Sequence, residues 1–182
     1  ERVLDLGSGS GMDCFIAALK VEDKGTVIGV DMTEEQLKKA NSLSLKSKFN
    51  NVSFIKSYIE DLPFDDNYFD VIISNGVINL SGDKEKVFQE IARVLKIGGR
   101  LAISDIVTKK KLTENITCNV TIWASCIGGA MQEDGYKEAI ENTGMKVITI
   151  KENPQYEFLS KSAINATIEF GVKSISLLAK KI

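Results

Sequence analysis

Residues 3–11 read Val3-Leu4-Asp5-Leu6-Gly7-Ser8-Gly9-Ser10-Gly11, a short apolar run that ends in a glycine-rich loop. The apolar run predicts a buried strand, and the one-turn spacing of apolar residues in Asp13–Val21 predicts the helix that follows. Glycines at such a strand–helix turn allow the backbone to turn tightly and to approach a ligand, and a helix N-terminus favours negative charge. This stretch therefore predicts a ligand-binding edge of an α/β sheet, with a turn that binds no ligand as the alternative.

The alternation of strand and helix continues along the chain. Apolar runs rich in Val, Ile and Leu predict buried strands, and amphipathic segments between them predict helices. The predicted strands are Arg2–Leu6, Thr26–Val30, Val52–Lys56, Asp70–Ser74, Arg100–Ser104, Lys146–Lys151 and Lys173–Lys180; the further predicted helices are Thr33–Lys48, Asp83–Lys96 and one within Tyr156–Phe170. We expect an α/β fold with a doubly wound, mostly parallel seven-stranded sheet, helices on both faces and one antiparallel strand in the last pair.

Two local signals predict where helices begin and end. Thr33-Glu34-Glu35-Gln36 has the spacing of a capping box, in which the first and last side chains satisfy main-chain N–H groups. Gly98-Gly99 is expected to stop the helix that begins at Asp83.

Length and composition limit the class of protein. A chain of 182 residues with 43% hydrophobic content can bury one sizeable core, so we expect a single domain over residues 1–182. The formal charge of −2 gives no electrostatic reason for a nucleic-acid or anionic-membrane partner, and no apolar run reaches the roughly 20 residues of a membrane span. Because Glu1 directly precedes a predicted strand, without an initiator Met or signal peptide, we expect a preceding N-terminal segment.

The cysteine and histidine content bears on compartment and chemistry. Cys14, Cys118 and Cys126 are an odd number without the short spacing of a zinc site or a disulfide framework, which fits a reducing cytoplasm. Histidine is absent, so chemistry that needs a histidine base or a His-ligated metal is excluded. No metal site is expected.

Two acidic positions predict contacts to a nucleotide-like cofactor. Asp31 ends a predicted strand twenty residues beyond Gly11, where a carboxylate accepts hydrogen bonds from ribose hydroxyls; a helix N-cap is the alternative. Ile59-Glu60-Asp61 follows the third strand, where an apolar residue and acids can stack on and bond to an adenine, although an exposed acidic turn is a rival. The G-x-G-x-G spacing differs from the dinucleotide G-x-G-x-x-G, which disfavours a nicotinamide-dependent oxidoreductase.

Four motifs together resemble the seven-stranded, S-adenosylmethionine-dependent class I methyltransferases. They are residues 3–11, Gly29-Val30-Asp31-Met32, Ile59-Glu60-Asp61-Leu62-Pro63 and Val94-Leu95-Lys96-Ile97-Gly98-Gly99, the last being the helix–turn before strand five. The resemblance covers essentially the whole chain and implies methyl transfer, with S-adenosylmethionine as the cofactor. The contacts it implies are Asp5, Gly7, Ser8, Gly9 and Gly11 with the methionine part, Asp31 with the ribose hydroxyls, Met32 and Ile59 on either side of the adenine, and Glu60 near its amino group.

Asn75 is a further candidate for the cofactor site. It comes at the C-terminal end of the predicted fourth strand, where its amide can hydrogen-bond the methionine moiety. An asparagine before Gly76 also favours a turn, which is the alternative reading.

Two segments are similar to signatures of the arsenite methyltransferases: Ser74-Asn75-Gly76-Val77-Ile78-Asn79-Leu80 and Trp123-Ala124-Ser125-Cys126-Ile127-Gly128-Gly129-Ala130. In that family a cysteine follows the Ser-Asn pair, and a second cysteine precedes the Gly-Gly-Ala. The resemblance implies that these thiolates hold trivalent arsenic, a soft centre that prefers soft ligands. The arsenic lone pair can itself attack the methyl group, so the protein need only position the two reactants in line. Cys126 is therefore the predicted catalytic residue, with a plain buried thiol as the alternative, and the expected acceptor is a small molecule.

The chain departs from this signature at Gly76, which stands where the first cysteine is expected. Cys118 lies eight residues before Cys126, about 12 Å apart on one helix, so the two could bind one atom only if that helix breaks. Trp123 either walls the acceptor pocket or fills a gap beneath a lid helix. Segments 106–145 and 153–171 are expected to form that acceptor-side lid. A methyltransferase for an organic small molecule and a non-catalytic cofactor-binding module remain alternatives.

Overall fold

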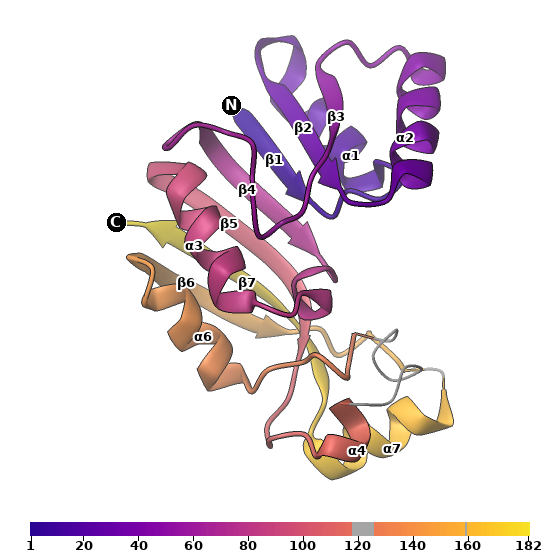
Figure 1. Cartoon of the computed structure of the whole chain (residues 1–182), viewed down its shortest axis with the longest axis vertical. Helices are drawn as coiled ribbons and strands as arrows, with labels where there is room; N and C mark the ends of the chain where they lie inside the picture. The colour runs from indigo at the N-terminus through magenta and orange to yellow at the C-terminus, as the bar shows by residue number, and fades with distance from the viewer. Residues whose placement is uncertain (118–125, 159) are drawn as a thin grey trace.

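The computed structural model describes residues 1–117, 126–158 and 160–182. The strands among these residues form one seven-stranded sheet in the order β3-β2-β1-β4-β5-β7-β6 (Figure 1). All neighbours pair in parallel except β7, which runs antiparallel to both β5 and β6. The strands are β1 (Arg2–Leu6), β2 (Thr26–Asp31), β3 (Val52–Lys56), β4 (Phe69–Asn75), β5 (Leu95–Val107), β6 (Met145–Glu152) and β7 (Lys173–Lys181). The predicted doubly wound, mostly parallel sheet is confirmed.

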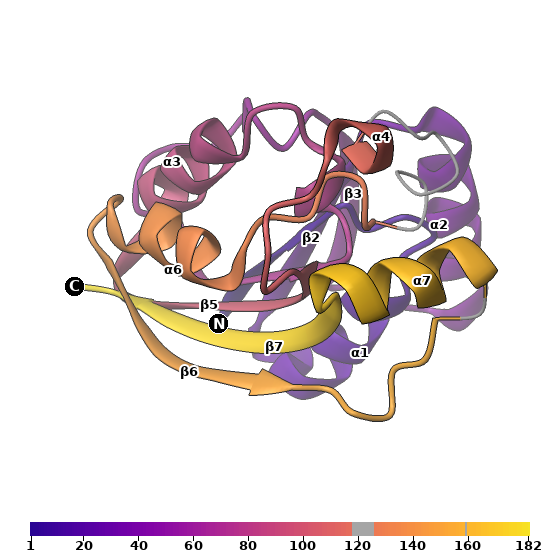
Figure 2. The same ribbon diagram turned by 90° about the horizontal axis from the view of Figure 1, so that it is seen from below.

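Helices lie on both faces of the sheet, as predicted. Those in the described residues are α1 (Met12–Val21), α2 (Glu34–Ser47), α3 (Lys84–Val94), α4 (Glu114–Thr117), α6 (Glu133–Glu141) and α7 (Lys161–Phe170), with the short 3-10 helices η1 (Glu22–Lys24) and η2 (Ile78–Leu80). Helix α1 packs on one face of the sheet, while α3 and α6 cover the opposite face of β5, β7 and β6 (Figure 2). Nowhere in the described part of the chain is a helix both long enough and apolar enough to cross a bilayer.

The central strand β1 is buried from both sides, which explains its unbroken apolar pattern. Val3 packs in the cluster under α1, whereas Leu4 and Leu6 belong to the large cluster that α3 and α6 cover. Val87 and Ile91 of α3 are fully buried in that second cluster. Burying each such side chain contributes about 1.5–3 kcal/mol, so packing on the sheet stabilises α3.

Both predicted helix-end signals need correction. Thr33 is the N-cap residue of α2, but its side chain makes no capping bond to any described residue. Instead, its N–H donates to Asp31 Oδ1 at 2.8 Å, so the carboxylate two residues earlier fixes the backbone where α2 begins. Helix α3 ends at Val94 rather than at the glycine pair, because Leu95 is already extended and pairs with Phe69 of β4. The glycine pair lies inside β5, where the register with β4 shifts.

Among the described residues of the C-terminal half, two helices were not predicted from the sequence pattern, the four-residue α4 and the longer α6. Helix α6 buries Tyr136 and Ile140, and the Tyr136 ring packs edge-on against Phe88 of α3 with the ring centroids 5.3 Å apart. Helix α6 has only nine residues and few apolar positions, so it offers little sequence from which to recognise a helix. The predicted helix near the C-terminus is α7, which begins after its N-cap Ser160 and ends at Gly171 in the left-handed conformation.

A separate hydrophobic cluster lies beyond the carboxyl ends of the strands. It joins residues that follow β5 to residues of α7, two parts of the chain about fifty residues apart (Figure 1). Its buried members are Ile106, Leu112, Ile127, Ala163, Ala166, Phe170 and Val172, and Cys126 packs against them.

The face of the sheet that carries α1 is covered only in part. Beside α1, a groove of about 570 Å³ runs over β4, β5, β7 and β6. Ile73, Ala102 and Leu178 contribute apolar side chains to it. Within the described residues no helix closes this groove (Figure 2).

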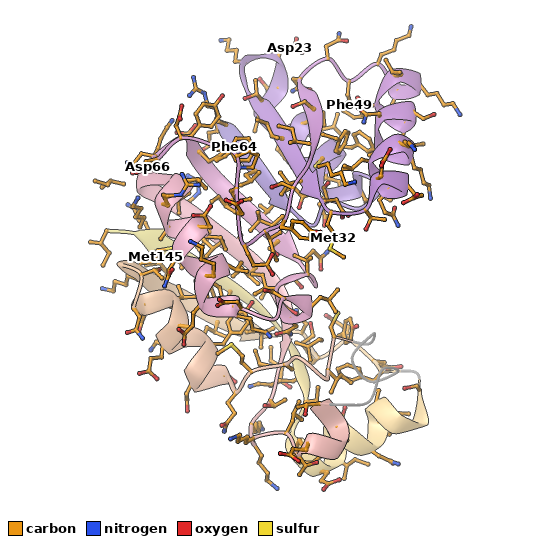
Figure 3. The ribbon with its side chains drawn as sticks, viewed as in Figure 1. Asp23, Met32, Phe49, Phe64, Asp66 and Met145 are labelled. Atoms are coloured by element: carbon orange, nitrogen blue, oxygen red, sulfur yellow. The ribbon has the colours of Figure 1, made fainter. Side chains whose placement is uncertain are left out.

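Arg93 of α3 holds the long connection between β3 and β4. Its guanidinium donates to the carbonyl oxygens of Leu62 (2.9 Å) and Phe64 (2.7 Å) and to the carboxylates of Glu90 (2.8 Å) and Asp66 (3.0 Å). Glu90 is buried and also accepts from the Leu62 N–H. Phe64 and Asp66 lie in this connection, beside α3 (Figure 3). One side chain therefore satisfies several main-chain and carboxylate groups at once.

We expect Arg93→Met to lower the free energy of unfolding by about 2–3 kcal/mol, because Glu90 would be left buried without its cation. Arg93 also holds the pKa of Glu90 below its ordinary value, so the loss should be fully present above pH 4.5 and shrink in more acid solution. Urea unfolding at several pH values measures it. Arg100→Met, which removes an exposed ion pair to Glu1, should change stability by less than about 1 kcal/mol. Equal losses in the two variants would contradict the assignment.

Candidate functional site

The loops that follow β1, β2, β3 and β4 meet at the carboxyl edge of the sheet. They enclose a cavity of about 300 Å³, within the size range of small-molecule sites. The cavity is lined by Gly7, Asp31, Met32, Thr33, Ser57, Tyr58, Ile59, Glu60, Val77, Leu80 and Ser81. Five of the predicted cofactor residues are therefore brought together: Gly7, Asp31, Met32, Ile59 and Glu60.

Asp31 occupies the point where the glycine loop and α2 meet. Its Oδ2 accepts the Gly9 N–H at 2.9 Å, and its Oδ1 accepts the Thr33 N–H at 2.8 Å. A carboxylate has about four lone-pair sites, so two such bonds leave acceptor capacity for hydroxyl groups in the cavity. The predicted ribose contact is thus compatible with this carboxylate, whereas the alternative of a helix N-cap at Asp31 is wrong, since the N-cap of α2 is Thr33.

The glycine loop needs its glycines at two points for different reasons. Gly7 has a φ of +68°, and a Cβ there would come within 2.5 Å of the Val77 side chain. Gly9 has a φ of +51°, and no described atom lies within 4 Å of where its Cβ would be. The backbone at Gly9 thus borders open space, as a loop that a ligand approaches closely requires.

The other walls of the cavity differ in polarity. Ile59 is almost buried, whereas Met32 is 63% exposed and lies at this edge of the sheet (Figure 3). The Glu60 carboxylate accepts a hydrogen bond from the Ser81 hydroxyl. Apolar walls, one carboxylate with free acceptor capacity and an open glycine loop are the features that an adenosine-containing cofactor needs, so the residues present fit S-adenosylmethionine.

Five predicted cofactor residues are not among those that line this cavity, and Gly9, described above, is one of them. Asp5 is 2% exposed beneath the loop, and Ser8 is also buried, with no hydrogen-bond partner for its hydroxyl among the described residues. Gly11 is the N-cap of α1. Asn75 borders the groove on the α1 side of the sheet instead, and its amide donates to Asp13 Oδ2 at 3.1 Å.

Asp5 forms a buried polar pair with Cys14 of α1. The Cys14 thiol donates to Asp5 Oδ2 at 3.1 Å, and the cysteine is fully buried. Burial raises the pKa of Asp5 to about 7, and burial together with the Asp5 charge raises the pKa of the Cys14 thiol. Cys14 is therefore a protonated, structural thiol.

The acceptor-side prediction brought together Gly76 and Cys126, which are fifty residues apart. In the structure the Cys126 thiol donates to the Gly76 carbonyl oxygen at 3.1 Å. Both residues have a positive φ, +70° at Gly76 and +60° at Cys126. No described atom lies within 4 Å of a Cβ at Gly76. Cys118 and Trp123 lie outside the described residues.

The turn after β4 connects the cavity to Cys126. Val77, Leu80 and Ser81 line the cavity, while the Gly76 carbonyl faces the Cys126 thiol. These three lining residues were missed in the sequence because apolar and small residues in a turn carry no signal of a ligand. Among the described residues no group of three or more Cys, Asp and Glu is arranged to hold a metal ion.

The chain belongs to the methyltransferase domain family, since residues 1–144 match the family model described as "Methyltransferase domain". Two curated arsenite methyltransferases are similar to it. The one from Halobacterium salinarum is 40% identical over 161 residues, which are 88% of this chain and 41% of that protein. The one from Aquipseudomonas alcaligenes is 44% identical over 150 residues, 79% of this chain and 43% of that protein. The chain thus spans about two fifths of the length of these relatives.

A solved structure extends the likeness to the fold. An arsenic(III) S-adenosylmethionine methyltransferase from Chlamydomonas reinhardtii superposes with a TM-score of 0.82 at 32% identity, over 100% of this chain and 63% of that one. The predicted class, a class I S-adenosylmethionine-dependent methyltransferase domain, and its resemblance to arsenite methyltransferases are confirmed.

We expect Asp5→Asn to remove a pH dependence of stability. Because the pKa of Asp5 rises from 3.8 to about 7 on folding, its contribution is fully present below pH 3.8 and is lost as the pH rises through 7. The wild type should therefore lose stability relative to the variant by about 1 kcal/mol per pH unit between pH 4 and 7. Urea unfolding across this range measures the difference.

Asp70→Asn is the matched control, because Asp70 bonds to the Arg2 N–H and pairs with Lys96, which lower its pKa. Its difference from wild type should be flat above pH 5. A flat profile for Asp5→Asn as well would show that Asp5 is ionised in the folded protein at neutral pH.

Proposed function

We propose that this domain transfers a methyl group from S-adenosylmethionine to a small acceptor, and that the leading acceptor is trivalent arsenic. The observation that carries the proposal is the contact between the Cys126 thiol and the Gly76 carbonyl. The turn that begins at Gly76 also lines the cavity that fits the cofactor. In this proposal a soft sulfur ligand would lie beside the methyl donor.

The cavity residues have distinct tasks in this proposal. S-adenosylmethionine, when bound, supplies a methyl group on a positively charged sulfur. Asp31 would accept hydrogen bonds from the ribose hydroxyls, and Met32 and Ile59 would pack on the adenine, with Glu60 near its amino group. The open backbone at Gly9 would let the methionine part approach the loop closely.

Cys126 would hold the acceptor. Trivalent arsenic binds thiolates strongly, and it keeps a lone pair that attacks an electrophilic carbon. The reaction therefore needs alignment of two reactants rather than a general base, which agrees with the absence of histidine from the chain.

We also propose that residues 1–182 form a single domain in which separate segments bind the cofactor and cover the acceptor. Segments 106–145 and 153–171 would form the acceptor-side lid, which the hydrophobic cluster around Ile127 and Phe170 supports. A cytoplasmic location is supported by the free thiols of Cys14 and Cys126, since reducing compartments keep thiols reduced.

An organic small molecule is the second candidate acceptor. Gly76 stands where arsenite methyltransferases place a cysteine, and the space at its Cβ position is open among the described residues. That space would admit a larger acceptor. A domain that binds the cofactor without turnover is the remaining alternative.

Methyl transfer to a panel of acceptors tests the proposal. The protein is incubated with S-adenosylmethionine labelled in the methyl group, and arsenite with a thiol is one member of the panel. Labelled methylarsenic species support arsenic as the acceptor. Labelled organic products without labelled arsenic species favour an organic acceptor. If no methyl group is transferred to any acceptor, the domain binds the cofactor without turnover.

Asp31→Ala should weaken S-adenosylmethionine binding at least tenfold. Hydrogen bonds to a charged group contribute about 1.5–3 kcal/mol each, and tenfold corresponds to about 1.4 kcal/mol. Isothermal titration calorimetry measures the dissociation constant. Asp61→Ala removes an exposed neighbouring carboxylate that is not among the cavity residues, and it should leave the affinity unchanged. Unchanged affinity in a folded Asp31→Ala protein would rule out the ribose contact.

Gly76→Cys should raise arsenite affinity at least tenfold, because it places a second thiol beside Cys126, and Cys126→Ser should cancel the gain. Since Gly76 has a φ of +70°, the new side chain also strains the turn by about 1–2 kcal/mol. Arsenite titration and thermal melting are measured together in a double-mutant cycle.

Gly76→Ser is the control for that strain, since it has the same Cβ without the thiol. It should lower stability as Gly76→Cys does but leave arsenite affinity as it is in the wild type. A folded Gly76→Cys protein with wild-type arsenite affinity would favour an organic acceptor.

A further inference from the structure

A buried polar network lies beneath the turn that carries Gly76. Asp105, on β5, is 2% exposed, and Asn79 and Tyr136 are fully buried. The Asn79 amide donates to Asp105 Oδ1 at 2.8 Å, and the Tyr136 hydroxyl donates to Asp105 Oδ2 at 3.3 Å. Neither the methyl-donor cavity nor the proposed acceptor contact uses these three side chains.

The network fixes the turn to β5 from two sides. The Gly76 N–H donates to the Ser104 carbonyl at 2.9 Å, one residue before Asp105. The Asn79 amide also donates to the Ile106 carbonyl at 2.6 Å, one residue after it. The Gly76 carbonyl, which lies between these anchors, therefore has little freedom to turn away from Cys126.

The contact at Gly76 favours the protonated form of Cys126. A carbonyl oxygen only accepts hydrogen bonds, so 3.1 Å from the sulfur it stabilises a thiol that donates to it and would repel a thiolate. Burial and the charge of Asp105 both raise the pKa of the Cys126 thiol. The other groups that face Asp105 are Tyr136 of α6 and Lys84, the first residue of α3, whose pKa burial lowers.

We propose that Asp105 is a positioning residue of the acceptor site: through Asn79 it fixes the Gly76 carbonyl, and it thereby keeps Cys126 in the thiol form until an acceptor binds. The reason for such a device rests on the proposed function. A thiolate is a strong nucleophile and a thiol is a weak one, so an ionised Cys126 beside the methyl donor would itself be methylated.

Loading of the acceptor then requires no base in the protein. The Cys126 sulfur forms a bond to arsenic as one thiolate or hydroxide ligand leaves the arsenic. The leaving ligand takes the proton from Cys126 and departs as a neutral thiol or as water. Asp105 takes no part in this proton transfer.

The ionisation of Cys126 tests the proposal without cofactor or acceptor. The rate of alkylation by iodoacetamide is measured from pH 6 to pH 10 by peptide mass mapping, in wild type, Asp105→Asn and Asn79→Ala. Asparagine at position 105 keeps the shape and removes the charge, whereas Asn79→Ala removes the link to the turn. Asp70→Asn is the matched control, and Cys14 is the internal reference thiol.

We expect Asp105→Asn to raise the alkylation rate of Cys126 at pH 8 at least threefold, with the pH profile displaced by half a unit or more toward acid. Asn79→Ala should raise the rate as much, and Asp70→Asn should not. If the alkylation rate of Cys126 rises equally at every pH and the pH profile is not displaced, the thiol has only become more accessible, which would overturn the proposal. A pH profile equal to that of wild type would also overturn it. If Asn79→Ala no longer melts cooperatively, the alkylation profile of Asp105→Asn tests the proposal by itself.

Incubation with S-adenosylmethionine and no acceptor separates this proposal from the proposed function. In the Asp105→Asn protein, the peptide that contains Cys126 should gain the mass of one methyl group faster than the same peptide does in wild type. If the alkylation profile shifts as expected but neither protein is methylated at Cys126, the positioning role stands and the placement of the methyl donor beside Cys126 is wrong.

Discussion

The parallel pairing of β1 with β2 on one side and with β4 on the other is the constraint on which the site depends. Parallel strands end at the same edge, so this pairing brings the glycine loop, Asp31 and the turn at Gly76 together. The contact between Gly7 and Val77 shows how closely two of these loops approach. Burial of β1 under helices on both faces makes the arrangement rigid, because a shift of one residue would reverse which side chains are buried.

The turn from Gly76 to Ser81 joins two functions that the sequence presents as separate motifs. Its apolar residues close the cavity, and its first carbonyl receives the Cys126 thiol. A change in this turn would therefore affect cofactor and acceptor together. The hydrogen bonds of Asn79 to β5 explain how so short a segment can keep both surfaces in place.

Two buried carboxylates lie on β1 and β5, on opposite faces of the sheet. Asp5 is paired with the Cys14 thiol, and Asp105 is held by Asn79 and Tyr136; burial raises the pKa of Asp5 to about 7 and that of Asp105 to about 6. Each carboxylate lies near a thiol, Cys14 beside Asp5 and Cys126 near Asp105. Burial and the charge of the carboxylate both raise the pKa of the thiol. Burial and a nearby negative charge thus both favour the protonated form of Cys14 and of Cys126.

The sequence by itself determined the sheet, the glycine loop and the position of Asp31, because apolar periodicity and glycine spacing are local properties that survive in any context. It also pointed to Gly76 and Cys126 as partners, through a resemblance rather than through spacing. Only the tertiary structure decided that Asp5 is buried beneath the loop, that Asn75 borders the groove beside α1, and that the Asp31 carboxylate bonds the N–H of Thr33 at the start of α2. An acid in the apolar run Ile103–Val107 was a visible signal for Asp105, but its partners Asn79 and Tyr136 come from segments 26 and 31 residues away. Such contacts depend on how strands and helices pack, and packing over long separations leaves no periodic trace in one chain.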